Sequence, residues 1–389
     1  MSIKKFMLLM MSALTLGACS ARATQPASGE QEEYDTIKIG GNLELSGGVS
    51  AYGIVQNNAI KLAIDEKNAQ GGVNGKQIEY EEYDNKSAPE EVTTGAARLV
   101  DLEDVAVLLG PATTGSVEAQ IPIALQSQTP MITPTATGDT ITLDNQGKTL
   151  PEVFRTCFQD SFQGAALGAF ANQKGFKKAA IIKDNGSDYG QNLADEFKNT
   201  YQGEIVADES YVTKETDFSA ILTNVKRQDA DVIFVAGYYE EAGPLIKQAR
   251  EMGIQAAILG PDGFGNEEIV NLAGKKNFTD IYYAAHFVAD ENSPQRTKDF
   301  MKNYKARYGT DPDMFAALAY DAAYLAFDAM ERAGSEKREA VRQALEATKD
   351  FEGITGTFSI DDKHNTVKTA FILEAKEGKV VDSTAIDPE

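Results

Sequence analysis

Two segments rich in hydroxyl side chains each follow a predicted buried strand. Gly110–Ser116 (GPATTGS) comes after the strand predicted over Val105–Leu109. Thr133–Thr137 (TPTAT) follows the strand predicted over Met131–Thr133. At the carboxyl end of a strand in an open α/β sheet, hydroxyls and the free N–H groups of a helix N-terminus could bind a carboxylate. Ser and Thr also cap helices at such positions, and composition alone favours capping.

Segments with acids and tyrosines follow predicted strands in the second half of the chain. They are Asp184–Gly190 after Lys178–Ile182, Gly237–Glu240 after Asp231–Ala236, and Gly260–Gly265 after Ala257–Leu259. Tyrosine offers an apolar wall and a hydroxyl, whereas an Asp among Gly and Pro is also an ordinary turn former, and each segment taken singly favours a turn. A zwitterionic amino acid buried away from water needs donors at its carboxylate and an acceptor at its ammonium. The segments of both halves together could supply these groups.

Residues for metal or nucleophilic chemistry are scarce. The chain has two histidines, His286 and His364, and no cluster of Cys and His, which leaves little material for a metal site or a Ser-His triad. Both histidines are predicted to be structural or solvent-facing. The glycine-rich segment Gly71–Lys76 (GGVNGK) fails the phosphate-binding patterns. The sequence therefore predicts no metal and no cofactor, while paired carboxylates, as in a glycosidase, cannot be judged without geometry.

The charge balance argues against one class of partner. The 389 residues include 37 Lys and Arg against 59 Asp and Glu, for a formal net charge of −22. A protein with this much negative charge repels nucleic acid, so no nucleic-acid partner is expected. The acidity itself is explained by solubility.

The N-terminal residues predict a compartment. Lys4 and Lys5 precede an apolar run over Phe6–Leu16, and Leu16–Cys19 has the sequence LGAC. This pattern resembles a lipoprotein signal peptide over residues 1–18, with Cys19 as the lipidated N-terminus after cleavage. The apolar run is too short to cross roughly 30 Å of hydrocarbon as a helix. We therefore expect an extracytoplasmic protein that is lipid-anchored to the outer face of the cell membrane.

The residues after this cysteine predict a tether. Ser20–Asp35 is polar and poor in large apolar side chains, so residues 19–35 are expected to form a lipidated Cys and a flexible linker. Cys157 is then the one remaining cysteine, which rules out an intramolecular disulfide. Its thiol is expected to pack in the core.

Beyond the tether, apolar runs typical of strands alternate with helical stretches, which predicts parallel α/β sheets. The chain is long enough for two such lobes. Besides the strands already named, the predicted strands are Ile37–Gly40, Gln77–Tyr83, Asp280–Ala284, Thr357–Ile360 and Thr369–Glu374. The predicted helices are Ile54–Ala69, Glu90–Asp101, Pro294–Tyr308 and Phe315–Ala333.

The segments occur in an order that resembles a known family. They are Gly47–Gly53, Asn68–Lys76, Gly110–Thr114, Pro134–Thr137, Asp188–Gly190 and Gly260–Gly263. Over about residues 36–384 the chain is similar to the type I periplasmic solute-binding proteins of branched-chain amino acid ABC transporters. Each motif alone is weak, but the series is specific, and the lipoprotein signal agrees with it.

The resemblance implies the fold and the function. It implies two doubly wound parallel-sheet lobes joined by a three-crossing hinge, with crossings near 154–158, 284–287 and 361–368. The N-terminal lobe would comprise residues 36–155 plus 287–362, and the C-terminal lobe 156–286 plus 363–389. The protein would be a monomer that binds Leu, Ile or Val between the lobes and delivers it to a membrane ABC permease. Alternatives are another amino acid, an amide or a short peptide as ligand, or a role as a sensor or an extracellular enzyme.

The resemblance also assigns the site. Thr114 and Thr137 would donate hydroxyls to the ligand carboxylate, with peptide groups around Thr135 and Ala136 completing the cradle. Asp262 would pair with the ammonium. The remaining predicted residues would close over the ligand or line its side-chain pocket: Tyr189, Tyr238, Tyr52, Ala112, Thr113 and, more peripherally, Phe315.

Overall fold

The computed structural model describes residues 36–386. Its strands are β1 (Thr36–Leu43), β2 (Gln77–Asp84), β3 (Val107–Leu109), β4 (Met131–Thr133), β5 (Val153–Arg155), β6 (Lys178–Asp184), β7 (Glu204–Tyr211), β8 (Val232–Ala236), β9 (Ala257–Gly260), β10 (Ile281–Ala285), β11 (Phe351–Gly353), β12 (Gly356–Phe358), β13 (Ala370–Lys376) and β14 (Lys379–Ile386). Its helices are α1 (Ser50–Ala69), α2 (Pro89–Asp101), α3 (Thr114–Ser127), α4 (Asp160–Lys174), α5 (Asp188–Thr200), α6 (Ser219–Gln228), α7 (Tyr239–Glu251), the 3₁₀ turn η1 (Asp262–Phe264), α8 (Glu267–Ala273), α9 (Gln295–Tyr308), α10 (Met314–Ala333) and α11 (Arg338–Glu346). The predicted signal peptide, lipidated Cys19 and tether lie outside the described residues.

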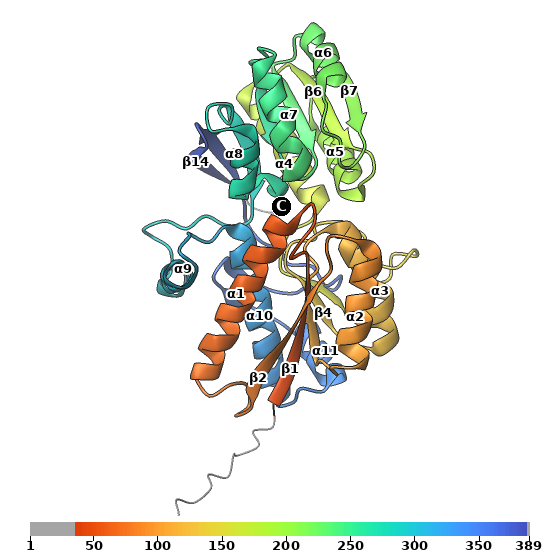
Figure 1. The fold of residues 1–389 in the computed structure, drawn as a ribbon, viewed down its shortest axis with the longest axis vertical. Helices are drawn as coiled ribbons and strands as arrows, with labels where there is room; N and C mark the ends of the chain where they lie inside the picture. The colour runs from red at the N-terminus through yellow and green to blue at the C-terminus, as the bar shows by residue number, and fades with distance from the viewer. Residues whose placement is uncertain (1–35, 387–389) are drawn as a thin grey trace, which may run out of the picture. The chain divides into compact units, whose positions relative to one another are not determined.

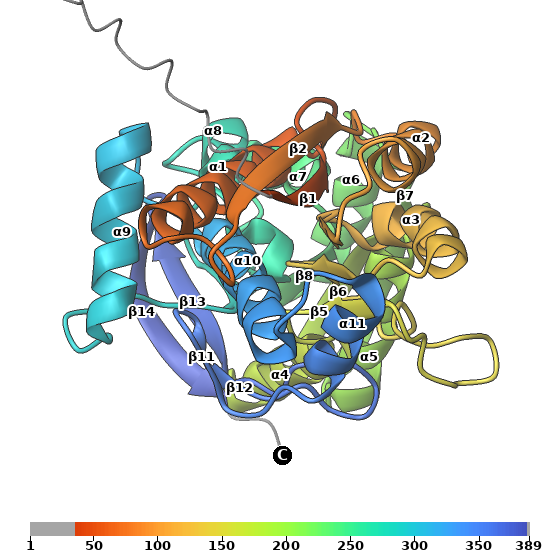
Figure 2. The same ribbon diagram turned by 90° about the horizontal axis from the view of Figure 1, so that it is seen from below.

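The first sheet has the strand order β2-β1-β3-β4-β5, and its neighbouring strands are parallel. Side chains of β3 alternate between its faces, as the pleat of a strand requires. Val107 and Leu109 pack with α1 and α10, whereas Leu108 packs with α2 and α3. Figure 2 shows these helix pairs on either side of the strands. Together with α9 and α11, this sheet forms what we call the first lobe.

The second sheet has the strand order β14-β13-β10-β9-β8-β6-β7. The strands from β10 to β7 are parallel, but β13 and β14 pair in the antiparallel sense. The central strand β8 is buried along its whole length, which is why it is a continuous apolar run in the sequence. With α4 to α8 this sheet forms the second lobe (Figure 1). The predicted parallel sheet is therefore extended by an antiparallel edge.

Within the described residues, the chain passes between the sheets three times: from β5 to α4, from β10 to α9 and from β12 to β13. These passages fall where the crossings were predicted. The first and third are bonded to each other, since Thr366 donates to the Cys157 carbonyl over 2.8 Å and Lys368 Nζ donates to the Thr156 carbonyl over 2.9 Å. The exact lobe boundaries stay a prediction.

Most predicted elements are present with shifted ends. Helix α1 begins at Ser50 rather than Ile54, and β12 ends at Phe358 rather than Ile360. Cys157 is fully buried, and burial raises the pKa of its thiol to about 12, which fits a packing role. Among the helices of residues 36–386, none combines the length and apolar character needed to cross a membrane.

Candidate ligand-binding site

A small pocket lies between the two lobes. Its walls come from segments that follow strands of both sheets, together with the first turns of α1 and α10. The lining residues are Tyr52, Ala112, Thr113, Thr135, Thr137, Tyr189, Tyr238, Asp262, Gly263 and Phe315. The structure therefore brings together most of the side chains that the sequence predicted. Thr114 and Ala136 are buried beside the pocket but do not line it.

The segment before α3 is held by a residue that sequence reasoning missed. Glu44 is fully buried and accepts hydrogen bonds from the N–H of Ala112 over 3.0 Å and from the hydroxyl of Thr113 over 3.2 Å. Burial raises the pKa of Glu44, and the Ala112 N–H opposes that rise. The Thr113 hydroxyl is thus engaged by Glu44. The Thr114 hydroxyl accepts from the N–H of Gly138 over 3.2 Å, so its own hydrogen stays available to a ligand.

The second hydroxyl-rich segment is also bonded internally. Thr135 donates its hydroxyl to the Ala112 carbonyl over 2.7 Å and accepts from Gln56 over 2.8 Å. The N–H of Ala136 donates to the Thr133 hydroxyl, and its carbonyl accepts from Arg155. These bonds fix the segment but leave Ala136 with both peptide groups already paired. Its role as a ligand contact remains a prediction.

At the opposite wall, Asp262 begins η1 and is 2% exposed. Its Oδ1 accepts from the Tyr189 hydroxyl over 2.6 Å and from Gln163 Nε2 over 3.2 Å. Its Oδ2 lies 2.9 Å from His286 Nε2. In the described part of the chain, no Lys or Arg forms an ion pair with this carboxyl group. A buried carboxylate with neutral donors alone is an acceptor suited to a cation.

Both histidines are buried, so the solvent-facing alternative is wrong. Burial lowers the pKa of His286, which leaves a neutral ring that donates from Nε2 to Asp262. This ring stacks on Phe158 at 3.5 Å between centroids. His364 stacks on Phe154 at 4.1 Å. His286 therefore joins a crossing segment to the candidate ammonium acceptor, a contact that spacing in the sequence could not show.

Aromatic rings form the remaining wall. Tyr189 and Tyr238 stack at 4.5 Å between centroids, and Tyr52 lies 4.5 Å from Phe315. Burial raises the pKa of Tyr238 well above its usual value. These phenols therefore stay neutral and present flat apolar surfaces with hydroxyls at their rims.

The lobes touch each other at the pocket. The Tyr52 hydroxyl, on α1, donates to the Gly263 carbonyl of the second lobe over 2.6 Å and accepts from the N–H of Tyr239 over 3.3 Å. The Tyr239 hydroxyl donates to the Gly48 carbonyl over 2.9 Å. Figure 1 shows this end of α1 directed toward the second lobe. The structure thus has a closed arrangement in which both lobes contribute to one pocket.

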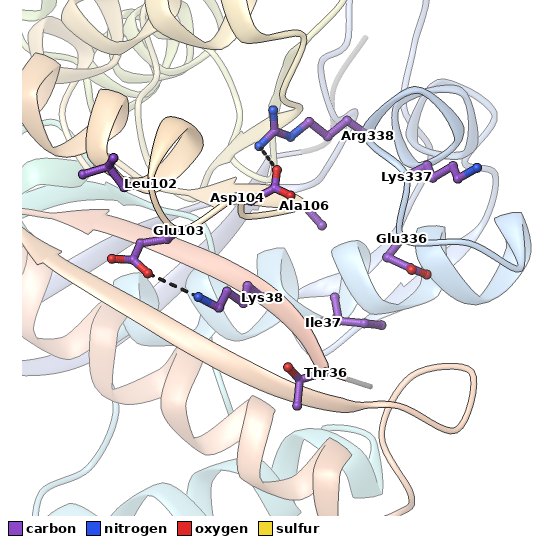
Figure 3. Close-up of a pocket in the computed structure, with 10 residues that line it drawn as sticks. All are labelled: Thr36, Ile37, Lys38, Leu102, Glu103, Asp104, Ala106, Glu336, Lys337 and Arg338. Atoms are coloured by element: carbon purple, nitrogen blue, oxygen red, sulfur yellow. Dashed lines mark hydrogen bonds and ion pairs between the residues drawn. The ribbon is translucent and has the colours of Figure 1, made fainter. Parts of the chain in front are cut away.

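A larger hollow lies elsewhere on the first lobe, at the amino ends of β1 and β3 (Figure 3). Its lining includes the ion pairs Lys38–Glu103, at 3.2 Å, and Arg338–Asp104, at 3.0 Å. None of the predicted site residues lines it. Exposed ion pairs of this kind contribute little and do not define a ligand site.

A family model described as periplasmic binding protein matches residues 36–379. The chain belongs to this family of extracytoplasmic solute-binding proteins, which are not enzymes. The resemblance and the α/β fold predicted from the sequence are thereby confirmed.

Particular relatives narrow the class. The branched-chain amino acid transporter substrate-binding protein LivJ from Streptococcus pneumoniae, solved in complex with isoleucine, is 42% identical with a TM-score of 0.87, covering 91% of this chain and 100% of that one. The leucine-, isoleucine-, valine-, threonine-, and alanine-binding protein of Pseudomonas aeruginosa is 31% identical over 332 residues, or 85% of this chain and 87% of that protein. An ABC transporter solute-binding protein from R. palustris, solved in complex with benzoate, is 25% identical with a TM-score of 0.80, covering 91% and 98%.

Proposed function

We propose that this protein is the solute-binding component of an ABC importer, that it binds leucine, isoleucine or valine between its lobes, and that it delivers the amino acid to a membrane permease as a monomer. Similarity along most of the chain to proteins named for these amino acids supports the proposal. The same lobes could hold other solutes, so the ligand must be argued from the pocket.

The observation that carries the proposal is the polarity of the pocket. One wall holds the hydroxyl of Thr137, with the hydroxyl of Thr114 buried beside it, and the opposite wall holds the buried carboxyl group of Asp262. An α-amino acid would place its carboxylate at the first wall and its ammonium at the second. Each charged group would then replace its lost hydration by charge-assisted hydrogen bonds.

The side chain of the ligand would lie against Tyr52, Ala112 and Phe315, which are apolar surfaces without a charged group. One methylene changes the transfer free energy by about 0.8 kcal/mol. Leucine, isoleucine and valine are therefore expected to bind with overlapping affinities. A charged side chain would find no partner at this wall.

Binding would favour closure because groups from both lobes contact one ligand. The first lobe would bind the carboxylate, and Asp262 with the tyrosines would reach the ligand as the lobes close. A ligand can change the free-energy difference between the open and the closed state by no more than the difference between its binding free energies for these two states. The contacts of the second lobe would supply that difference.

Replacement of Asp262 by Asn tests the site. Asp262→Asn keeps the shape of the side chain but removes the charge that faces the ammonium, and loss of one partner of a buried charged pair costs about 2 to 5 kcal/mol. Isothermal titration calorimetry is expected to show leucine binding weakened by about 30-fold or more. The exposed Asp229→Asn is a matched control and should bind as the wild type does. Equal affinities of wild type and Asp262→Asn would refute the ammonium role.

Attachment through Cys19 is part of the proposal and rests on the sequence LGAC at residues 16–19. Cys19→Ala removes the sulfur that would carry the lipid, so the protein is expected to leave the membrane fraction and to lose incorporation of labelled palmitate. Fractionation of cells that express both forms measures this. Persistence of Cys19→Ala in the membrane fraction would contradict lipid anchoring.

A further inference from the structure

A histidine on the second crossing between the lobes reaches the acid at one wall of the pocket. His286 directly follows β10, and its side chain is buried. Its Nε2 lies 2.9 Å from Oδ2 of Asp262. Its ring stacks on the ring of Phe158, which is buried on the first crossing, at 3.5 Å between centroids. The ring is therefore held between two crossings while one of its nitrogens faces the acid.

The surroundings of the His286 ring determine where its hydrogen lies. A neutral imidazole has one N–H donor and one acceptor nitrogen. The nitrogen beside a carboxylate oxygen must be the donor, so Nε2 carries the hydrogen and Nδ1 is the acceptor. Nδ1 is buried and has no hydrogen-bond partner among the described residues, so a second proton there would find no acceptor. Burial lowers the pKa of His286, the hydrogen bond to Asp262 opposes this, and the charge of Lys368 on the third crossing adds to it.

A neutral histidine can hold the carboxylate of Asp262 without cancelling its charge. No Lys or Arg within residues 36–386 forms an ion pair with Asp262. A Lys or Arg in the place of His286 would supply a cation of its own, and the ammonium of a ligand would have to compete with it. The imidazole donates one hydrogen bond and leaves the negative charge for the ligand.

The contacts of Asp262 determine which of its oxygens can accept from a ligand. A carboxylate has about four acceptor positions on its two oxygens. Oδ1 accepts from the Tyr189 hydroxyl over 2.6 Å and from Gln163 Nε2 over 3.2 Å, so both of its positions are occupied. In the described part of the chain, Oδ2 accepts from His286 alone. An ammonium in the pocket would therefore bind at Oδ2, the oxygen that His286 holds.

We infer that His286 is a positioning residue for ligand binding, because its Nε2–H and its stack on Phe158 fix the Asp262 carboxylate with Oδ2 toward the ammonium of the ligand. The inference rests on the proposed function, in which Asp262 pairs with that ammonium. Without the donor, Oδ1 alone would hold the carboxylate, and Oδ2 could turn away from the ligand. A binding group held by a second, packed side chain keeps its geometry better than one held by its own backbone alone.

Substitutions of His286 separate its donor from its ring. His286→Phe keeps a ring that can stack on Phe158 but has no donor, so leucine binding is expected to weaken about tenfold or more in calorimetry at pH 7. His286→Gln loses the ring but keeps an N–H donor of similar reach, so its affinity should stay within about threefold of wild type. His364→Phe is the matched control and should bind as the wild type does. His364 is also buried and stacked, on Phe154, but it does not line the pocket.

A double-variant cycle tests whether His286 acts through Asp262. In the Asp262→Asn background the charge that His286 would orient is gone, so adding His286→Phe should weaken leucine binding by less than about twofold. A merely structural role would have its full effect in both backgrounds. His286→Met, which also lacks a donor, replaces His286→Phe if circular dichroism shows that the Phe variant is unfolded.

The outcomes separate this inference from the proposed function. Weaker binding by His286→Phe, rescue by His286→Gln and no added loss in the Asp262→Asn background support the positioning role. Wild-type affinity of His286→Phe, equal losses in His286→Phe and His286→Gln, or a full added loss in the Asp262→Asn background would overturn it and leave the ammonium role of Asp262 intact. If the wild type does not bind leucine, or if Asp262→Asn binds it equally well, the proposed site fails and the inference fails with it.

Discussion

At the scale of single residues, buried acids give this protein a distinctive pH dependence. Glu241 on α7 is 2% exposed and accepts from the N–H of Lys214 over 2.7 Å. Burial, with added repulsion from Glu240 and Asp184, raises its pKa from 4.5 to about 7. The folded state therefore holds this proton more tightly than the unfolded state does. The contribution of Glu241 to stability is consequently lost as the pH rises from about 4.5 to about 7.

Glu241→Gln should remove that loss. The Gln oxygen can still accept from Lys214, but it does not ionise, so the variant is expected to gain about 1 to 3 kcal/mol relative to wild type between pH 4.5 and pH 8. Urea unfolding across this range measures the difference in the free energy of unfolding. Glu251→Gln, at the exposed end of the same helix, is the control and should follow the wild-type profile. If the free energy of unfolding changes with pH in the same way for Glu241→Gln and wild type, Glu241 does not titrate between pH 4.5 and pH 8.

At the scale of elements, periodicity predicted the central strands because they are short apolar runs buried on both faces, but it did not predict β5, β7, β11 or β14. β4 has the predicted bounds, and β3 is a part of its predicted range. Helix α1 was predicted to begin late because its first turn carries Tyr52 and Gly53, which pack against the second lobe and Glu44 instead of forming an apolar stripe. The antiparallel direction of β13 and β14 could not be predicted. Side chains alternate between the two faces of the sheet in the same way in parallel and in antiparallel strands.

The site was predictable only in part, for a related reason. The segments after strands could be expected to meet, since the carboxyl ends of parallel strands share one edge of a sheet. The residues that support them could not, because each contact spans a large separation in sequence. Gln163 and Asp262 are 99 residues apart, and Ala112 is 68 residues from Glu44. Such partners carry no local signal and become visible only in the folded chain.

At the scale of the whole described chain, the hydroxyl of Tyr52 acts as a latch between the lobes. It donates to Gly263 and accepts from Tyr239, and both bonds require the closed arrangement. Its ring also packs on Phe315, independently of the hydroxyl. In the proposed function the lobes open and close, and this latch would stabilise the closed state relative to the open one.

Tyr52→Phe keeps the ring and removes the latch. In the closed state the Gly263 carbonyl and the Tyr239 N–H would lose their partner, which costs about 1 to 3 kcal/mol. We expect leucine affinity to fall by about 5- to 100-fold, mainly through faster dissociation measured by stopped-flow fluorescence. Tyr201→Phe, which removes the hydroxyl that donates to the Phe176 carbonyl in the second lobe, is the control and should leave dissociation unchanged. Small-angle scattering of Tyr52→Phe should reach the wild-type radius of gyration only at higher leucine concentrations. A wild-type dissociation rate in Tyr52→Phe would mean that closure depends on the ligand contacts alone.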